Sequence, residues 1–169
     1  MQVHTDSYEI ALKAWFICHI TEVWHTWDVK VNGYKIEPCA DLTHATLSGA
    51  YLYRAWLAEA NLYGANLNGA YLDGADLSGA NLTNANLINA DLINADLTNA
   101  NLANANLNGA YLESANLNDA NLNDANLSNA DLIKADLTNA DLTNANLTNA
   151  NLAGANLTGA TMPDGTTHD

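Results

Sequence analysis

The sequence predicts an all-β solenoid, in which the chain winds through stacked coils from residue 40 onward. Alanine occupies every fifth position from Ala40, and leucine follows two residues after each alanine, which gives 24 complete units ending at Gly159. Residues two apart point to the same face of an extended segment, so Ala and Leu share a face. A helix needs apolar residues about every 3.6 positions and a strand every second one, so a five-residue period requires a turn in each unit.

The fifth residue of each unit is suited to that turn. Of the 24 complete units, 8 end in Gly, 9 in Asn and 2 in Asp, and these residues tolerate left-handed or turn conformations. Each unit therefore predicts one short extended side followed by a bend, and repeated bends wind the chain into a solenoid. The exceptions at this position are His44, Arg54, Glu59, Ser114 and Lys134.

The pattern Ala-(Asp/Asn)-Leu-x-x, repeated over residues 40–162, resembles the pentapeptide-repeat family. The resemblance implies a right-handed quadrilateral β-helix with four units per coil, so that the units make about six coils. At a spacing of about 4.7–4.9 Å between coils, the rod would be about 29 Å long, with leucine along its axis. Long Asn- and Asp-rich arrays of this kind look most like those of cyanobacteria.

The first 39 residues differ in composition and predict an N-terminal cap. Asp6 and Glu9 fit a capping box, and apolar residues at helical spacing then predict a helix at about residues 7–24. Its structural role would be to cover the open end of the solenoid. The alternative is that this helix binds a partner.

A β-hairpin is predicted to complete this cap. Short alternating runs at 29–31 and 34–36 flank Asn32-Gly33, a dipeptide typical of two-residue hairpin turns. Pro38 ends the second run. We therefore expect a helix and hairpin together before the first repeat.

The repeat pattern stops at Met162. The chain then divides into a cap at 1–39, the β-helix at 40–162 and a tail at 163–169. So short a tail predicts a poorly covered C-terminal coil. A homodimer joined through that coil is one arrangement that would cover it.

The charge of the chain is concentrated in the rod. The chain carries 19 acids and 5 bases, and the only bases after residue 39 are Arg54 and Lys134. An acidic rod disfavours nucleic acid and anionic membranes as direct partners and favours a basic protein surface. The two cysteines, Cys18 and Cys39, do not make a disulfide framework, so we expect free thiols. Without a secretory signal in the first residues, we expect a cytoplasmic location.

Residues twenty apart should stack if four units make one coil, which sorts the rod into four sides. The sides that begin at Ala40, Ala45, Ala50 and Ala55 are called the first to the fourth. The second side carries no acid and mostly asparagine after its alanines, and stacked asparagines can form hydrogen-bonded ladders. The candidate interaction surface lies on the third and fourth sides. It consists of Tyr51, Tyr71, Tyr111, Asp91 and Asp131 on the third side, and Asp76, Asp96 and Asp136 on the fourth.

The tyrosines of the third side have two interpretations. An outward row of tyrosines beside acids is typical of an interaction surface. Alternatively, stacked tyrosines support one another as cross-strand pairs. Both remain open from the sequence.

No catalytic or cofactor-binding constellation is found. His19 and His25 lie near Cys18 without a recurring metal-ligand spacing, and the glycines are spread over the corners rather than gathered in a phosphate-binding loop. The aspartates follow no calcium-binding loop pattern. We therefore expect no enzyme, no metal and no cofactor.

Three functions remain. The resemblance broadly implies a binding or scaffold protein that presents a rigid acidic surface to a protein partner. Some family members mimic DNA at the DNA site of type II topoisomerases such as gyrase, which implies the alternative. That alternative is weakened because the central inward residue is leucine in every complete unit and no unit carries an inserted loop. The third function is a structural spacer without a specific partner.

Overall fold

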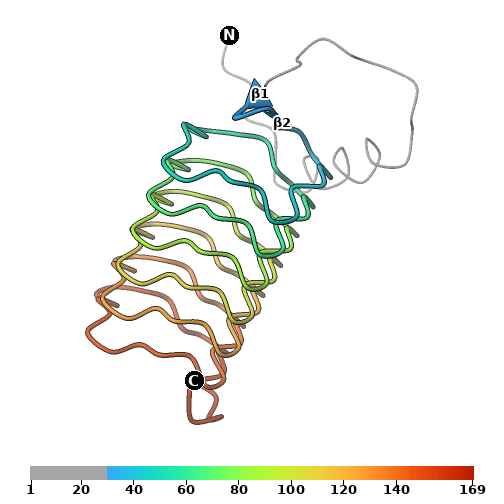
Figure 1. The fold of residues 1–169 in the computed structure, drawn as a ribbon. Coiled ribbons are helices and arrows are strands. Elements are labelled where there is room, and N and C mark those ends of the chain that lie inside the picture. The colour runs from blue at the N-terminus through green and yellow to red at the C-terminus, as the bar shows by residue number, and fades with distance from the viewer. Residues whose placement is uncertain (1–29) are drawn as a thin grey trace, which may run out of the picture.

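The computed structural model describes residues 30–169, which form a rod of stacked coils that runs from the hairpin near residue 30 to the C-terminus at the opposite end (Figure 1). A short hairpin, strands β1 (Lys30–Val31) and β2 (Tyr34–Lys35), stands at the N-terminal end. The helix predicted at residues 7–24 lies outside the described residues. No helix in the described part of the chain is long and apolar enough to cross a membrane.

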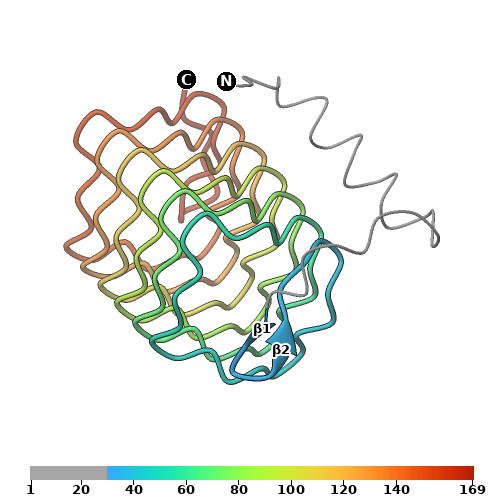
Figure 2. The same ribbon diagram turned by 90° about the horizontal axis from the view of Figure 1, so that it is seen from above.

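The coils are twenty residues long. The second residue of each unit pairs in parallel with the residue twenty positions later, from Asp41 with Asn61 to Asp141 with Thr161. Four five-residue units therefore close one turn of the solenoid, as predicted. Figure 2 shows the coils lying over one another with the same four-sided outline.

Three of the five N–H groups in each unit bond to a neighbouring coil wherever the rod has a coil on both sides. The second residue donates to the coil before it, and the third and fifth residues donate to the coil after it. In the unit that begins at Ala80, Asn81 donates to the carbonyl of Ala60 (2.9 Å), Leu82 to that of Asn101 (2.7 Å) and Asn84 to that of Ala103 (3.0 Å). Stacking thus satisfies most of the backbone donors.

The other two N–H groups are satisfied within the chain segment itself. The first residue of the next unit donates to the leucine carbonyl, as Ala85 does to Leu82 (3.0 Å). The fourth residue donates to the side-chain oxygen of the second, as Thr83 does to Asn81 Oδ1 (3.2 Å). This last bond, which we call the turn cap, explains why Asn and Asp prevail at the second position, since both carry an oxygen that reaches two residues ahead.

The asparagine ladders are confirmed in part. Asn81 Nδ2 donates to Asn61 Oδ1 (3.1 Å) on the first side, and Asn126 Nδ2 donates to Asn106 Oδ1 (3.2 Å) on the second. Because an asparagine amide has both a donor and an acceptor, one side chain can cap its own turn and bond to the next coil.

Every fifth residue of the 24 units has a positive φ, so the predicted corners are confirmed. The corner includes residues with large side chains, such as Glu59 (φ 57°) and Lys134 (φ 56°). A side chain in this left-handed region is unfavourable by about 1–2 kcal/mol. The hydrogen bonds of the coil therefore hold these residues in a conformation that they do not favour.

The core is a single column of leucine with alanine beside it. Leucines along the rod, such as Leu102, are fully buried, and most unit alanines are as well. No polar side chain is buried among the described residues. Stability therefore rests on apolar burial and on coil stacking rather than on polar networks in the interior.

The hairpin predicted around Asn32-Gly33 is confirmed and packs on the first coil. Asn32 has φ 53° and Gly33 has φ 86°, both in the left-handed region that such a turn requires. Asn32 Nδ2 donates to the carbonyl of Thr46 (3.1 Å), and the Thr46 N–H donates to the Tyr34 hydroxyl (3.3 Å). Val31 and Tyr34 also pack against the core, so the hairpin covers part of this end.

The C-terminal tail folds back over one corner of the last coil. Thr161 pairs with Thr167, and the N–H of His168 donates to the carbonyl of Ala160 (2.8 Å). The leucines of this coil are only partly buried, unlike those of the middle of the rod: Leu147, Leu152 and Leu157. Within the described chain, the tail leaves this end of the core incompletely covered.

One expectation about the cysteines is wrong. Cys39 is disulfide-bonded rather than a free thiol. The other cysteine of the chain, Cys18, lies outside the described residues.

We predict that Leu102→Ala lowers the free energy of unfolding by about 2–5 kcal/mol, since it leaves a cavity in a core that neighbouring coils hold rigid. Chemical denaturation measures the loss. Leu152→Ala, in the partly exposed last coil, is the control and should cost less. Equal losses at the two sites would contradict the burial difference.

We predict that Asn101→Ala lowers the free energy of unfolding by about 0.5–1.5 kcal/mol, because Asn101 Oδ1 accepts the Ala103 N–H (3.1 Å). Asn101→Asp keeps the acceptor oxygen and should leave stability nearly unchanged. The same denaturation experiment compares the two variants. An aspartate variant as unstable as the alanine variant would show that the turn cap does not stabilise the coil.

Candidate protein-interaction surface

The third side of the rod carries two parallel columns of outward side chains. The first column consists of the second residues of its units, which pair in succession: Tyr51, Tyr71, Asp91, Tyr111, Asp131 and Asn151. The second column consists of the fourth residues of these units: Tyr53, Asp73, Ile93, Glu113, Ile133 and Ala153. From Asp73 onward, the carbonyls of this column accept bonds from the corners of the coils before them. The buried leucines lie between the two columns.

Acidic and apolar side chains alternate on this side, and the two columns are out of phase. The coils at 70 and 110 have tyrosine in the first column and an acid in the second. The coils at 90 and 130 have aspartate in the first column and isoleucine in the second. Each acid therefore has an apolar neighbour across the coil, and the pattern repeats every forty residues.

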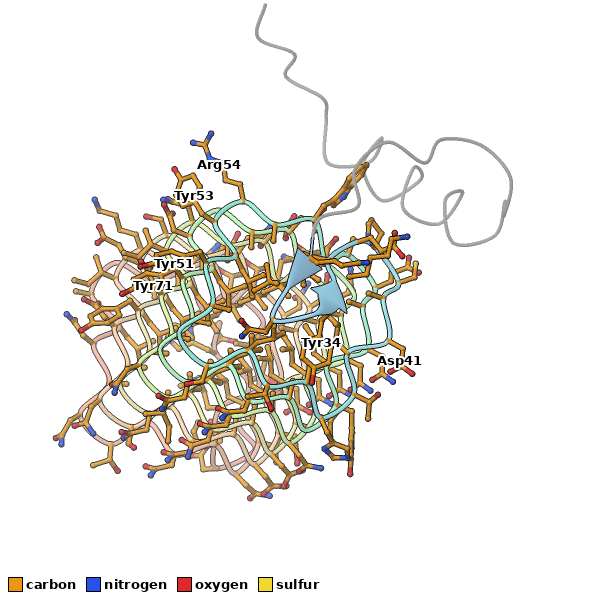
Figure 3. The ribbon with its side chains drawn as sticks, turned by 45° about the horizontal axis from the view of Figure 1, so that its top comes forward. Tyr34, Asp41, Tyr51, Tyr53, Arg54 and Tyr71 are labelled. Atoms are coloured by element: carbon orange, nitrogen blue, oxygen red, sulfur yellow. The ribbon has the colours of Figure 1, made fainter. Side chains whose placement is uncertain are left out.

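The tyrosines are exposed, and only two of them stack. The exposed fraction is 79% for Tyr51, 46% for Tyr71 and 52% for Tyr111. The rings of Tyr51 and Tyr71 are parallel within 6° with centroids 4.9 Å apart, as Figure 3 shows. Tyr111 lies between Asp91 and Asp131 and has no tyrosine on an adjacent coil. Mutual support thus accounts for the first pair but not for Tyr111.

Tyrosine at the second position gives up the turn cap. Its hydroxyl lies at the far end of a rigid ring and is not suited to accept the N–H two residues ahead. Within the described rod, no side chain caps the N–H of Tyr53, Asp73 or Glu113, which follow the three tyrosines. Three units of one side therefore lack a bond that most other units make.

The acids in the first column of the third side, Asp91 and Asp131, provide the turn cap. Asp91 Oδ1 accepts the N–H of Ile93 (3.3 Å), and Asp131 Oδ1 accepts that of Ile133 (3.1 Å). Both carboxylates are partly exposed, so each one caps a turn and still presents negative charge to solvent.

The sequence-predicted acids of the fourth side are held more firmly. Asp76, Asp96 and Asp136 each accept two bonds, from the N–H (3.0 Å) and hydroxyl of the serine or threonine two residues ahead. They share a column with Trp56, Asn116 and Asn156. The structure thus places the eight predicted residues on two adjacent sides rather than in one cluster.

The same serine or threonine bond acts on acids at the two ends of the rod. The Thr43 hydroxyl and N–H lower the pKa of Asp41, and the Thr166 hydroxyl and N–H lower the pKa of Asp164. Both bonds favour the ionised carboxylate. Sequence reasoning missed this pairing, although an acid followed two residues later by Ser or Thr is visible in the sequence.

A basic group already lies on an aromatic ring at the edge of the third side. The Arg54 guanidinium lies 5.1 Å from the centroid of the Tyr53 ring. Figure 3 shows both side chains at the same edge as Tyr51 and Tyr71. No cluster of three or more metal-ligating side chains occurs in the part of the chain that the structure describes.

The alternation could have been found in the sequence. Tyr-Leu-Asp at 71–73 is matched by Tyr-Leu-Glu at 111–113, and Asp-Leu-Ile at 91–93 recurs at 131–133. These matches are forty residues apart, twice the coil length. Sorting by single coils placed the tyrosines and these acids on the same side but did not show that the two columns alternate.

Comparison with known proteins identifies related repeats. The family model for pentapeptide repeats matches eight copies, at residues 39–74, 60–99, 95–133 and 125–162. A solved pentapeptide-repeat protein from the thylakoid lumen of Arabidopsis thaliana is 35% identical with a TM-score of 0.54, and the match covers 58% of this chain and 68% of that one. The comparison with curated proteins finds no match.

Two further solved structures are similar in sequence pattern. HetL, a pentapeptide-repeat protein involved in heterocyst differentiation regulation in the cyanobacterium Nostoc, is 36% identical with a TM-score of 0.31, covering 77% of this chain and 75% of that one. QnrB1, a plasmid-mediated fluoroquinolone resistance protein, is 17% identical with a TM-score of 0.34, covering 72% and 68%.

The family model spans the whole rod and the twenty-residue coil gives the four-sided architecture expected of it. This chain belongs to the pentapeptide-repeat family.

Proposed function

We propose that this chain is a non-enzymatic binding module that holds a protein partner on its third side. The observation that carries the proposal is the placement of Tyr71 and Tyr111, which are exposed and which stand where Asn or Asp would cap the turn. A side chain that serves only the fold would not replace a cap with an exposed ring. Exposed tyrosine is enriched where proteins bind one another.

The charge of the surface sets the kind of partner. Asp73, Asp91, Glu113 and Asp131 alternate with the apolar side chains of the third side. Opposite charge on the partner would speed association and fix its position, while the apolar groups would supply buried area. The partner surface that fits is therefore basic and partly apolar.

The structure favours this function over a structural spacer. A spacer needs only the core, the corners and the turn caps, and the second side, with its row of asparagine, has little else. The third side departs from that minimum at three units. Departures that weaken the turn and expose aromatic rings suit a surface that binds.

The acidic columns of the rod support the alternative function, which is mimicry of DNA. However, Asp76, Asp96 and Asp136 have a local role, because each caps its turn through two hydrogen bonds. Their presence is thus explained without a topoisomerase partner. A gyrase supercoiling assay separates the two functions, since the proposed binding module should not inhibit at micromolar concentration.

The disulfide gives information about the compartment in which the protein is located. Disulfides persist mainly in oxidising compartments, and Cys39 is disulfide-bonded. The cytoplasmic location expected from the sequence is at odds with that bond. One solved relative comes from the thylakoid lumen. Fractionation of the source cell measures the location directly.

We also propose that two copies of the chain join through the C-terminal coil. Support comes from Leu147, Leu152 and Leu157, which a facing coil would bury. We predict that light scattering at high concentration gives twice the chain mass of 18.0 kDa. A monomer under those conditions would contradict the proposal.

We predict that Tyr71→Asn combined with Tyr111→Asn abolishes capture of a specific partner from the source cell. Asparagine fits the second position and restores the turn cap, so stability should hold or rise by about 0.5–1.5 kcal/mol per site. Affinity capture with the full chain, followed by identification of the bound proteins, is the measurement.

The control is Tyr63→Asn, which removes an exposed tyrosine from the first side. It should leave the captured proteins unchanged. If the third-side variant captures the same proteins as the unaltered chain, then the third side is not the binding surface.

A further inference from the structure

We propose that the partner segment is a basic amphipathic α-helix lying along the rod axis on the third side. This inference rests on the proposed function and specifies its partner. It depends on the out-of-phase columns of acidic and apolar side chains, which define both a spacing and a lateral pattern that a bound segment must match.

The acids of the third side form a zigzag. Asp73 and Glu113 lie in the second column, Asp91 and Asp131 in the first, and each lies one coil beyond the last. With coils about 4.8 Å apart, the four acids span about 14 Å along the axis. A partner must therefore present one basic group about every 5 Å, alternately to either side.

A helix meets this condition. Its pitch is about 5.4 Å, and residues at i, i+4, i+7 and i+11 alternate across one face while spanning about 16 Å. The mismatch with the acids accumulates to only about 2 Å, which the flexible stem of lysine can absorb. On the same helix, residues at i+3, i+8 and i+10 flank the basic ones and meet the apolar positions between the acids.

An extended partner segment does not match the spacing of the acids along the rod axis. Side chains on one face of a strand are about 6.7 Å apart, so four of them span about 20 Å. That exceeds the span of the acids by about 6 Å. The spacing thus distinguishes a helix from a strand, which charge alone would not.

The side chains of the third side suit both kinds of contact. Tyr71 and Tyr111 are exposed, and Ile93 and Ile133 are partly exposed, so apolar area is available between the acids. The Arg54 guanidinium over Tyr53 shows that a cation can lie against a tyrosine of this side. A lysine or arginine of the partner can therefore contact a carboxylate and a ring together.

The charged residues that a bound helix would face all belong to the third side of the rod. Within the repeats the bases are Arg54 and Lys134, which occupy corners of the third side at the first and fifth of its six units. Between them lie only acidic, apolar and neutral side chains. The helix therefore lies over the units at 70, 90, 110 and 130, with Arg54 one unit before it and Lys134 at the corner of its last unit.

The test measures binding of two labelled synthetic peptides to the full chain by fluorescence anisotropy. The first has lysine at i, i+4, i+7 and i+11 and leucine at i+3, i+8 and i+10. The second has the same composition with lysine at every second position. We expect the first to bind at least about tenfold more tightly, to gain helicity by circular dichroism and to weaken as salt rises.

Matched variants locate the binding. Asp91→Asn with Asp131→Asn removes two charges from the third side and keeps both cap oxygens. Asp76→Asn with Asp136→Asn makes the same change on the fourth side. We expect the third-side pair to weaken the first peptide about tenfold or more and the fourth-side pair to change it by less than about threefold. Thermal unfolding confirms that both variants remain folded.

Two results would overturn the inference. Equal loss from both pairs would show attraction to the overall negative charge, and tighter binding of the second peptide would show an extended partner. Failure of both peptides would also reject a helical partner. If both peptides fail but capture of a partner still depends on Tyr71 and Tyr111, the proposed function stands. If both peptides fail and capture does not depend on these tyrosines, the proposed function is rejected as well.

Discussion

The hydrogen bonds between coils twenty residues apart are the constraint on which the rest of this protein depends. They fix which residues stack, since the Asn81 N–H bonds to the carbonyl of Ala60 in the coil before and the Leu82 N–H to that of Asn101 in the coil after. They also hold residues such as Glu59 and Lys134 in left-handed corners. The leucine column follows from the same register, because a shift of one residue would turn every leucine outward.

With the backbone so constrained, the second position of each unit is where structure and function compete. Asparagine serves the fold best, since one amide can cap a turn and reach the next coil. Aspartate keeps the cap and adds charge, as at Asp91. Tyrosine abandons the cap and adds exposed apolar area, as at Tyr111. The three choices explain why one side of the rod can be a plain scaffold while another carries a binding pattern on the same backbone.

The fold was largely predictable because its signals are local and repeated. The five-residue period predicted a side and a bend in each unit, and the family resemblance implied four units per coil. The Gly, Asn and Asp residues predicted the corners, and Asn32-Gly33 predicted the hairpin. The turn caps were not predicted, since they depend on side-chain geometry, and the disulfide at Cys39 was not predicted either. The candidate residues Tyr71 and Asp76 were correctly sorted to neighbouring sides, but the alternation across the third side appears only when both columns are seen together.

The forty-residue repeat of the third side has a consequence for how such a rod can change in length. Inserting or deleting one whole coil would preserve every kind of backbone bond, every corner and the leucine column. However, where the coils are rejoined it would place tyrosine over tyrosine or aspartate over aspartate in the first column of the third side. Changes of two coils would keep both the fold and the alternation. The backbone pattern therefore repeats every twenty residues and the surface pattern every forty, so only a change by an even number of coils preserves the surface pattern.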